Sequence, residues 1–263
     1  MKFYFFGGDF NSLNKIYENK FDGTLFLYNS ASSEFFTDLA YHSNLLKKDF
    51  KYMVAIRPYV ISPQYLSMIH RSFYSKMGDM LQINLISGWI KPEEKPFNSF
   101  VGEVNDESNS IERSEYLIKY LKAINNLKNN LNNIKSEKFS DIYSIEKNIP
   151  DIYVSTTNNF VFDAASQYNN KMIIPYSLYK KDFDLSNKDF LISIGPIIRN
   201  NKKDLENLDP ANVRNDMLLC TPESLINTLK DFKNKNVGGV LLFAWEEERD
   251  RLFDFMKNYK DLI

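Results

Sequence analysis

The chain has 263 residues, of which 43% are hydrophobic, so it is long enough to bury a full core. Its 33 basic and 34 acidic residues leave a net charge of −1, which argues against a nucleic-acid partner or an anionic membrane surface. Cys220 is the one cysteine, which excludes an intramolecular disulfide and a cysteine-based metal site and indicates a reducing compartment. We expect one cytoplasmic domain spanning residues 1–263.

The chain begins MKFYFFGGDF, a short apolar run that Gly7, Gly8 and Asp9 interrupt. This run is too short for a signal peptide or a membrane span, and no later run approaches the roughly 18 apolar residues that a spanning helix needs. We therefore interpret the segment as the first strand and expect no membrane partner.

Short apolar runs alternate with longer segments of helical period, which is typical of β/α units around a parallel sheet. The predicted strands are Lys2–Phe6, Thr24–Tyr28, Tyr52–Arg57, Leu81–Ser87, Ile152–Ser155, Met172–Pro175, Phe190–Ile194 and Val240–Phe243. Eight such strands predict an α/β fold, a (β/α)8 barrel.

Two helices carry the clearest signals. After the fourth strand, apolar residues recur at spacings of three and four at Leu117, Tyr120, Leu121, Ile124, Leu127, Leu131 and Ile134. Asn109 precedes Glu112 by three residues, as in a capping box. Before the last strand, Thr221 and Pro222 suit a helix start, and Asn236 to Gly239 suit its exit.

Two polar stretches, 91–109 and 200–215, follow strands and are predicted as loops. In a (β/α)8 barrel the loops after strands form the catalytic face, so both are candidate lids. They could equally be surface connections without a chemical role.

Asn84 is the first candidate binding residue, because it places an amide among apolar residues of a strand that should be buried on both faces. Its side chain offers both a donor and an acceptor to the edge of a planar heterocycle. The alternative is an amide that is satisfied within the barrel.

The turn Ser155-Thr156-Thr157-Asn158-Asn159 precedes a helix and offers N–H groups and hydroxyls to a phosphate. Ordinary helix capping explains the same residues. Both interpretations stay open at this point.

Other polar residues give weaker signals. His42 and His70 fit surface or packing roles better than catalysis, and two histidines cannot build a histidine-rich metal site. Arg57 could reach a cofactor or pair with a carboxylate. The glutamates 246–248 fit a solvated helix start. No catalytic triad, Walker loop or dinucleotide fingerprint is present.

The segment from Tyr52 to Glu93 resembles the luciferase-like flavin monooxygenases, especially the branch of alkanesulfonate and pyrimidine monooxygenases. The resemblance rests on Arg57-Pro58, on Ser62-Pro63 with its helix, and on the strand from Asn84 to Gly88-Trp89. It continues through Glu112 to Leu117, the turn at Thr157-Asn158, and the segment from Leu218 to Leu242.

The resemblance implies reduced FMN at the carboxyl-terminal mouth of the barrel, supplied by a separate NAD(P)H-dependent flavin reductase. Asn84 would contact the ring, and Glu93 and Arg113 would lie near the ribityl-phosphate part. Ser114, Thr157 and Asn158 would contact the phosphate. The family also often forms dimers, so a homodimer is open.

The chain departs from the family pattern at several places. Ser33 stands where the sulfonate branch has a cysteine, and Ser193-Ile194-Gly195 stands where that branch has Arg-x-His, so we do not expect a sulfonate substrate. The phosphate turn lacks glycines, Ser114 replaces a usual tyrosine, and loops are shortened.

Three functions follow from these residues. The first is a two-component FMN-dependent monooxygenase acting on a small or peptide-borne organic substrate. The second uses reduced flavin or a deazaflavin to transfer hydride without oxygen insertion. The third is a non-catalytic flavin-binding or structural subunit.

Overall fold

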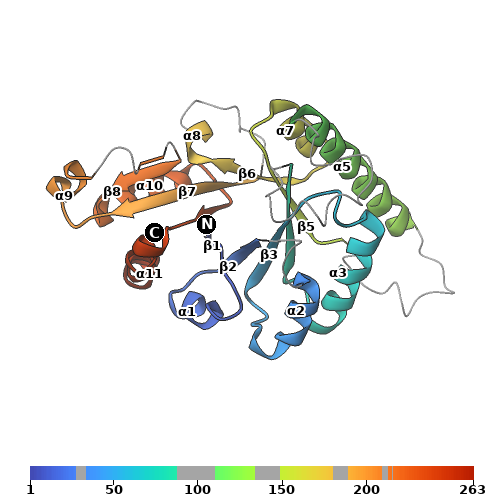
Figure 1. Cartoon of the computed structure of the whole chain (residues 1–263), viewed down its shortest axis with the longest axis horizontal. Helices are drawn as coiled ribbons and strands as arrows, with labels where there is room; N and C mark the ends of the chain where they lie inside the picture. The colour runs from blue at the N-terminus through green and yellow to red at the C-terminus, as the bar shows by residue number, and fades with distance from the viewer. Residues whose placement is uncertain (28–33, 88–109, 134–148, 180–188, 209–212, 215) are drawn as a thin grey trace. The chain divides into compact units, whose positions relative to one another are not determined.

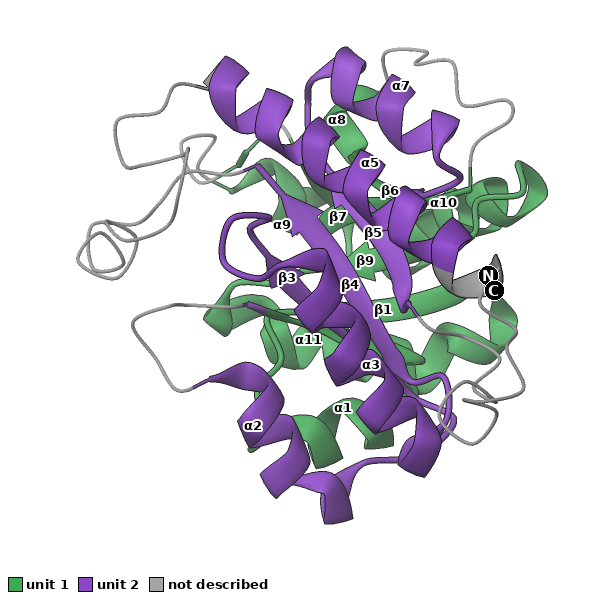
Figure 2. Ribbon diagram, turned by 90° about the vertical axis from the view of Figure 1, so that its right-hand side faces the viewer, with its two compact units in different colours: residues 1–26, 172–263 green, residues 27–171 purple. Residues whose placement is uncertain are grey.

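The computed structural model describes residues 1–27, 34–87, 110–133, 149–179, 189–208, 213–214 and 216–263. The chain forms two compact units (Figure 2). Unit 1 combines residues 1–26 with 172–263, and unit 2 is the segment between them, 27–171. The expected single domain remains a prediction.

Unit 1 is built on parallel strands from the two ends of the chain. Strand β1 (Lys2–Phe6) lies between β2 (Gly23–Leu27) and β9 (Gly239–Leu242), and β7 (Phe190–Ile198) pairs with β9, β6 (Lys171–Pro175) and β8 (Met217–Cys220). The helices of this part are α1 (Leu13–Glu18), α8 (Tyr176–Tyr179), α9 (Lys202–Glu206), α10 (Pro222–Asn234) and α11 (Glu246–Tyr259), followed by a 3-10 turn at Lys260–Leu262.

Unit 2 contains three neighbouring parallel strands, β3 (Lys51–Ile56), β4 (Leu81–Ile86) and β5 (Asp151–Ser155). The helices in its described residues are α2 (Phe35–Tyr41), α3 (Pro63–Met77), α5 (Ser110–Asn133) and α7 (Asn159–Gln167), with a 3-10 turn at Ser43–Leu45. Helices α3 and α5 lie along one side of β3 and β4 (Figures 1 and 2).

Local sequence explains where the clearest helices begin and which faces they bury. Thr221 and Ser224 form a capping box at the start of α10, with Pro222 in its first turn, as predicted. Asn236 takes a positive φ of 58° at the exit, a conformation that asparagine tolerates. In α5 the buried residues are Ser114, Leu117, Tyr120, Leu121 and Ile124, which confirms the apolar stripe as far as its side chains are described.

All eight predicted strands are present, and all but one agree with the structure to within one residue at each end. The exception is β7, which continues for four residues past the predicted end, from Gly195 to Ile198. That extension pairs with β8, a ninth strand that the sequence pattern missed. Strand β8 has only four residues and is partly exposed, so it carries little periodic signal.

The predicted loop 200–215 is partly wrong, because Lys202–Glu206 forms the short helix α9. Asn201 caps this helix by accepting a hydrogen bond from the Asp204 N–H at 3.0 Å. The other predicted loop, 91–109, and the cap residue Asn109 lie outside the described residues.

Strands and helices alternate along the chain, and the strand pairings within each unit are parallel. This is the organisation of a (β/α)8 barrel, with β8 as an addition to the eight barrel strands. The predicted fold class is therefore confirmed.

Candidate functional site

The candidate site lies on one face of β3, β4 and β5 in unit 2. Residues paired in register between parallel strands share a face, so Ala55, Asn84 and Tyr153 stand side by side. The opposite face carries Val54, Ile83 and Val154, fully buried and apolar as helix-covered strands require. The face that holds Asn84 is therefore the inner face of the strands, away from the helices.

Asn84 is 3% exposed and makes a specific hydrogen bond. The hydroxyl of Ser155, the last residue of β5, donates to Asn84 Oδ1 at 2.9 Å. This contact occupies the amide oxygen and leaves both hydrogens of Nδ2 to donate elsewhere. The amide oxygen of Asn84 is thus satisfied within the fold, and the contact of Asn84 with a ligand stays a prediction.

Gln82 adds a second amide on the same face, two residues earlier on β4. It is 2% exposed, and its Oε1 has no hydrogen-bond partner among the described residues. Sequence reasoning singled out Asn84 and missed Gln82, although the period of two along a strand places both on one face. A buried acceptor of this kind needs a donor, from bound water or from a ligand.

Arg113 lies in the first turn of α5, and Ser114 follows it at the start of the second. Arg113 Nε donates to the carbonyl oxygen of Ser87 at 2.9 Å, which ties the helix start to the carboxyl end of β4. Ser114 is 6% exposed and lies on the buried stripe of α5. Glu93, the remaining predicted residue of this group, lies outside the described residues.

Some of the polar groups in the turn before α7 are hydrogen-bonded within the turn itself. The N–H of Asn158 donates to Thr156 Oγ1 at 3.0 Å, and Asn158 Oδ1 accepts from the Phe160 N–H at 3.0 Å. Asn158 is therefore the helix cap, as the alternative interpretation held. The N–H groups of Thr157 and Asn159 donate to no other described residue, so these two donors at the positive end of the helix dipole remain for an anion.

Arg57 and Tyr59 lie directly after β3, whereas the two histidines belong to helices. Arg57 directly follows β3 and is 6% exposed, and Tyr59 packs against Val60 and Tyr116. His70 is fully buried in α3 beside the ring of Tyr74, with 5.7 Å between ring centroids, and His42 ends α2. Neither position points to catalysis. Among the described residues no group of three or more metal-ligating side chains occurs.

Unit 1 presents a different surface at the carboxyl ends of its strands. Phe6, which ends β1, and Phe243, which follows β9, form an edge-to-face pair with centroids 6.2 Å apart. Gly195 on β7 makes room for this pair, because a Cβ there would lie 2.4 Å from the Phe243 ring. This aromatic wall was not predicted, since the sequence shows only separate phenylalanines.

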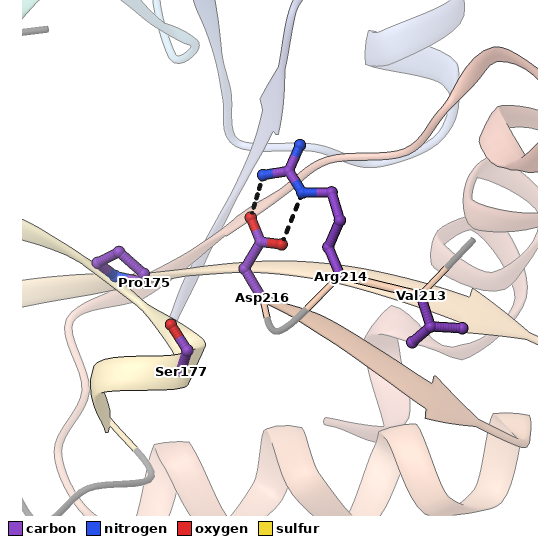
Figure 3. Close-up of a pocket in the computed structure, with 5 residues that line it drawn as sticks. All are labelled: Pro175, Ser177, Val213, Arg214 and Asp216. Carbon is purple, nitrogen blue, oxygen red and sulfur yellow. Dashed lines mark hydrogen bonds and ion pairs between the residues drawn. The ribbon is translucent and has the colours of Figure 1, made fainter. Parts of the chain in front are cut away.

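An open pocket of about 520 Å³ in unit 1 is lined by Pro175, Ser177, Val213, Arg214 and Asp216 (Figure 3). Arg214 pairs with Asp216 through two hydrogen bonds, from Nε at 3.0 Å and from Nη2 at 2.6 Å. The backbone holds the pair in place, since Gly195 N–H donates to the carbonyl of Asp216 at 3.2 Å. The pocket is therefore anchored where β7 begins to pair with β8.

The glutamates after β9 do not all face solvent, which corrects the interpretation of residues 246–248. Glu248 accepts two hydrogen bonds from the Arg199 guanidinium at 2.7 and 2.8 Å, and these side chains are only 12% and 17% exposed. The hydrogen bond to Glu248 raises the pKa of Arg199, so the guanidinium stays charged. Glu246 and Glu247 are exposed, as predicted.

Cys220, at the end of β8, is a structural residue. It is 1% exposed, and burial raises the pKa of its thiol to about 12. The protonated thiol is a poor nucleophile at neutral pH, so this residue does not enter the site.

The fold and the site together define a class of (β/α)8 proteins with a polar inner face on β4 and β5. No family model matches the chain, and no curated protein sequence matches it. Solved structures do match. The three structures that follow share 8–9% sequence identity with this chain, and at that level the similarity shows the fold alone.

EDTA monooxygenase from Chelativorans sp. BNC1 is similar over 100% of this chain and 94% of its own, with 9% identity and a TM-score of 0.67. Riboflavin lyase with modified FMN and riboflavin is similar over 100% and 91%, with 8% identity and a TM-score of 0.64. The coenzyme F420-dependent tetrahydromethanopterin reductase from Methanopyrus kandleri is similar over 98% and 97%, with 9% identity and a TM-score of 0.60. The resemblance expected from the sequence is thus confirmed at the level of the fold.

None of the described helices is both long enough and apolar enough to cross a bilayer.

Proposed function

We propose that this chain is a flavin-dependent oxidoreductase that uses reduced FMN and molecular oxygen on a small or peptide-borne organic substrate. A separate NAD(P)H-dependent reductase would supply the reduced flavin. The observation that most directly supports this proposal concerns Asn84. It is buried on the inner face of β4, its amide oxygen accepts a hydrogen bond from Ser155, and its two Nδ2 hydrogens are left to donate. The fold shared with an oxygenase and with an enzyme solved with modified FMN supports the proposal.

The hydrogen-bond donors of the described residues suit both the ring and the phosphate of FMN. Asn84 Nδ2 offers hydrogen bonds to ring oxygen and nitrogen acceptors. The N–H groups of Thr157 and Asn159 offer two donors to a phosphate at the start of α7, only two and four residues after Ser155. Arg113, anchored on Ser87, adds a positive charge at the same end of β4.

When bound, reduced flavin supplies the two electrons that activate oxygen. The protein's own contribution is binding and orientation. Asn84 holds the ring edge, Thr157 and Asn159 hold the phosphate, and Arg113 offsets part of its charge. Ser114, buried at the start of the second turn of α5, would contact the phosphate. The buried, apolar opposite face keeps water out of the strand layer behind the ring.

Binding of chemically reduced FMN under anaerobic conditions, measured by calorimetry, tests the proposal. We expect the wild-type protein to bind, and Asn84→Ala to weaken binding about tenfold, since one hydrogen bond contributes about 1.4 kcal/mol. Asn126→Ala, on an exposed position of α5, is the matched control and should bind like wild type.

Failure of the wild-type protein to bind reduced FMN would overturn the proposal. If Asn84→Ala abolishes a measured activity while urea unfolding shows an intact fold, the non-catalytic alternative is excluded.

The F420-dependent reductase with the same fold favours a second candidate, in which a deazaflavin or reduced flavin transfers hydride without oxygen. The residues on β4, β5 and α7 could hold the ring and phosphate of either cofactor, so the two candidates differ in chemistry rather than in the site.

A further inference from the structure

We propose that the pocket of unit 1 binds a neutral organic molecule with an apolar body and an amide head group, and that it discriminates against the matching carboxylate. The residues that line this pocket are Pro175, Ser177, Val213, Arg214 and Asp216. The proposal goes beyond the flavin site and does not rest on the proposed function, because that site lies on the strands of unit 2. Three features support it: the place of the pocket in the sheet, the ion pair in its wall, and the uncharged residues beside that pair.

The pocket lies at a gap along one edge of β7. The N–H of Met172 in β6 donates to the carbonyl of Asp189, and the N–H of Gly195 donates to the carbonyl of Asp216, which directly precedes β8. Backbone groups of a strand point alternately to its two edges, so Asp189 and Gly195 face the same edge. Strand β6 therefore pairs with the first half of this edge and ends at Pro175, and β8 pairs with the second half. The pocket occupies the place where one strand leaves the sheet and the next one joins it.

An ion pair forms the polar wall of this pocket. Arg214 donates to the two carboxylate oxygens of Asp216, from Nε at 3.0 Å and from Nη2 at 2.6 Å. The guanidinium has further N–H groups, so the hydrogens of Nη1 remain without a partner among the described residues. The Asp216 carboxylate also keeps lone pairs beyond these two contacts. The wall thus offers a donor and an acceptor side by side, and the formal charges of the pair cancel.

The ion pair contributes little to holding the chain in place. The Arg214 side chain is 62% exposed, and exposed ion pairs add little to stability. The backbone hydrogen bond from Gly195 to Asp216 already fixes the start of β8. The side chains of the pair are therefore available to a ligand.

The other residues that line the pocket are uncharged, and they select the rest of the ligand. Pro175 and Val213 supply apolar surface, and the hydroxyl of the half-buried Ser177 can donate or accept (Figure 3). An amide presents its carbonyl to Arg214 and its N–H to Asp216. A carboxylate has no proton to donate to Asp216 and is repelled by it. The volume of about 520 Å³ accommodates a small organic molecule.

Benzamide and benzoate are matched probes, because they share an apolar ring and differ in the head group. Titration of the methyl-labelled wild-type protein near neutral pH and without flavin, followed by NMR at the Val213 methyl groups, measures both dissociation constants. We expect benzamide to bind about tenfold more tightly than benzoate, since it gains a charge-assisted hydrogen bond to Asp216 and avoids a like-charge contact. Benzoate binding as tight as that of benzamide would overturn the proposal, and so would a benzamide titration that leaves the Val213 signals unshifted.

Asp216→Asn tests whether the carboxylate of the ion pair is the selecting group. We expect benzoate to bind this variant about tenfold more tightly than wild type, because the repelling charge is gone and Arg214 can pair with the ligand. Asp231→Asn is the matched control, since it removes a carboxylate from the exposed ion pair with Lys235 at the end of α10 and should leave both dissociation constants unchanged. Unchanged benzoate binding in a folded Asp216→Asn protein would contradict the proposal.

The comparison of the two probes on the wild-type protein decides the proposal even where the variant does not fold. A protein that binds benzamide but not reduced FMN would overturn the proposed function and leave this inference standing.

Discussion

Single residues decide how the inner face of β4 can be used. Asn84 and Gln82 differ in what the fold gives them, since Asn84 Oδ1 has the Ser155 hydroxyl and Gln82 Oε1 has no partner among the described residues. The sequence indicated Asn84 as a candidate binding residue, because its amide interrupts an apolar strand. It could not predict the partner, because Ser155 lies 71 positions away in the chain.

Glu248 is the residue whose role changed most between sequence and structure. Its carboxylate and the Arg199 guanidinium are largely buried, so removing one partner leaves a charge without compensation. We expect Glu248→Ala to lower the free energy of unfolding by about 3 kcal/mol.

The control for this prediction is Glu247→Ala, the exposed neighbour in the same helical turn, which should change stability by less than about 0.5 kcal/mol. Urea unfolding followed by circular dichroism measures both. Equal effects of the two substitutions would show that the Arg199–Glu248 pair contributes no more than the acidic helix start.

At the level of elements, β7 is the strand that the local pattern described least well. Its first half pairs with β6 and β9, and its second half, from Gly195, pairs with β8. Apolar runs predicted the first half, whereas the extension contains Gly195 and Pro196, which usually end a strand. Pairing with β8 keeps this segment extended, and that is a tertiary effect.

Gly195 connects this element to the aromatic wall of Phe6 and Phe243. We expect Gly195→Ala to destabilise the protein by about 1–2 kcal/mol, because its Cβ would overlap the Phe243 ring at 2.4 Å and push it away from Phe6. Thermal unfolding measures the loss.

The double variant Gly195→Ala with Phe243→Leu tests the cause, since the smaller side chain makes room and should recover part of the stability. Ser193→Ala, on the same face of β7, is the control. A double variant no more stable than the sum of the single effects would place the strain elsewhere.

The turn before α7 shows how far local chemistry predicts an element's function. Sequence reasoning left phosphate binding and capping open; the structure confirms capping, and phosphate binding stays a prediction. Asn158 caps the helix, while the N–H groups of Thr157 and Asn159 remain. Which side-chain oxygen caps depends on backbone angles, which the residue types alone leave undetermined.

At the scale of the whole molecule, the choice between oxygenation and hydride transfer is the main functional question. For the proposed monooxygenase we expect turnover of a substrate to need oxygen in a one-to-one ratio and to stop under argon. An oxygen electrode together with product analysis measures this. Undiminished anaerobic turnover would favour the hydride-transfer alternative.

The sequence by itself determined the (β/α)8 order, seven strands to within one residue, the helix caps at Thr221 and the candidate Asn84. These features depend on residues close together in the chain, where periodicity and capping chemistry act. Only the tertiary structure decided the Ser155–Asn84 contact, the Arg199–Glu248 pair, the ninth strand and the aromatic wall. Each of these depends on distant segments packing together, and the energy of such contacts cannot be computed from neighbours in the sequence.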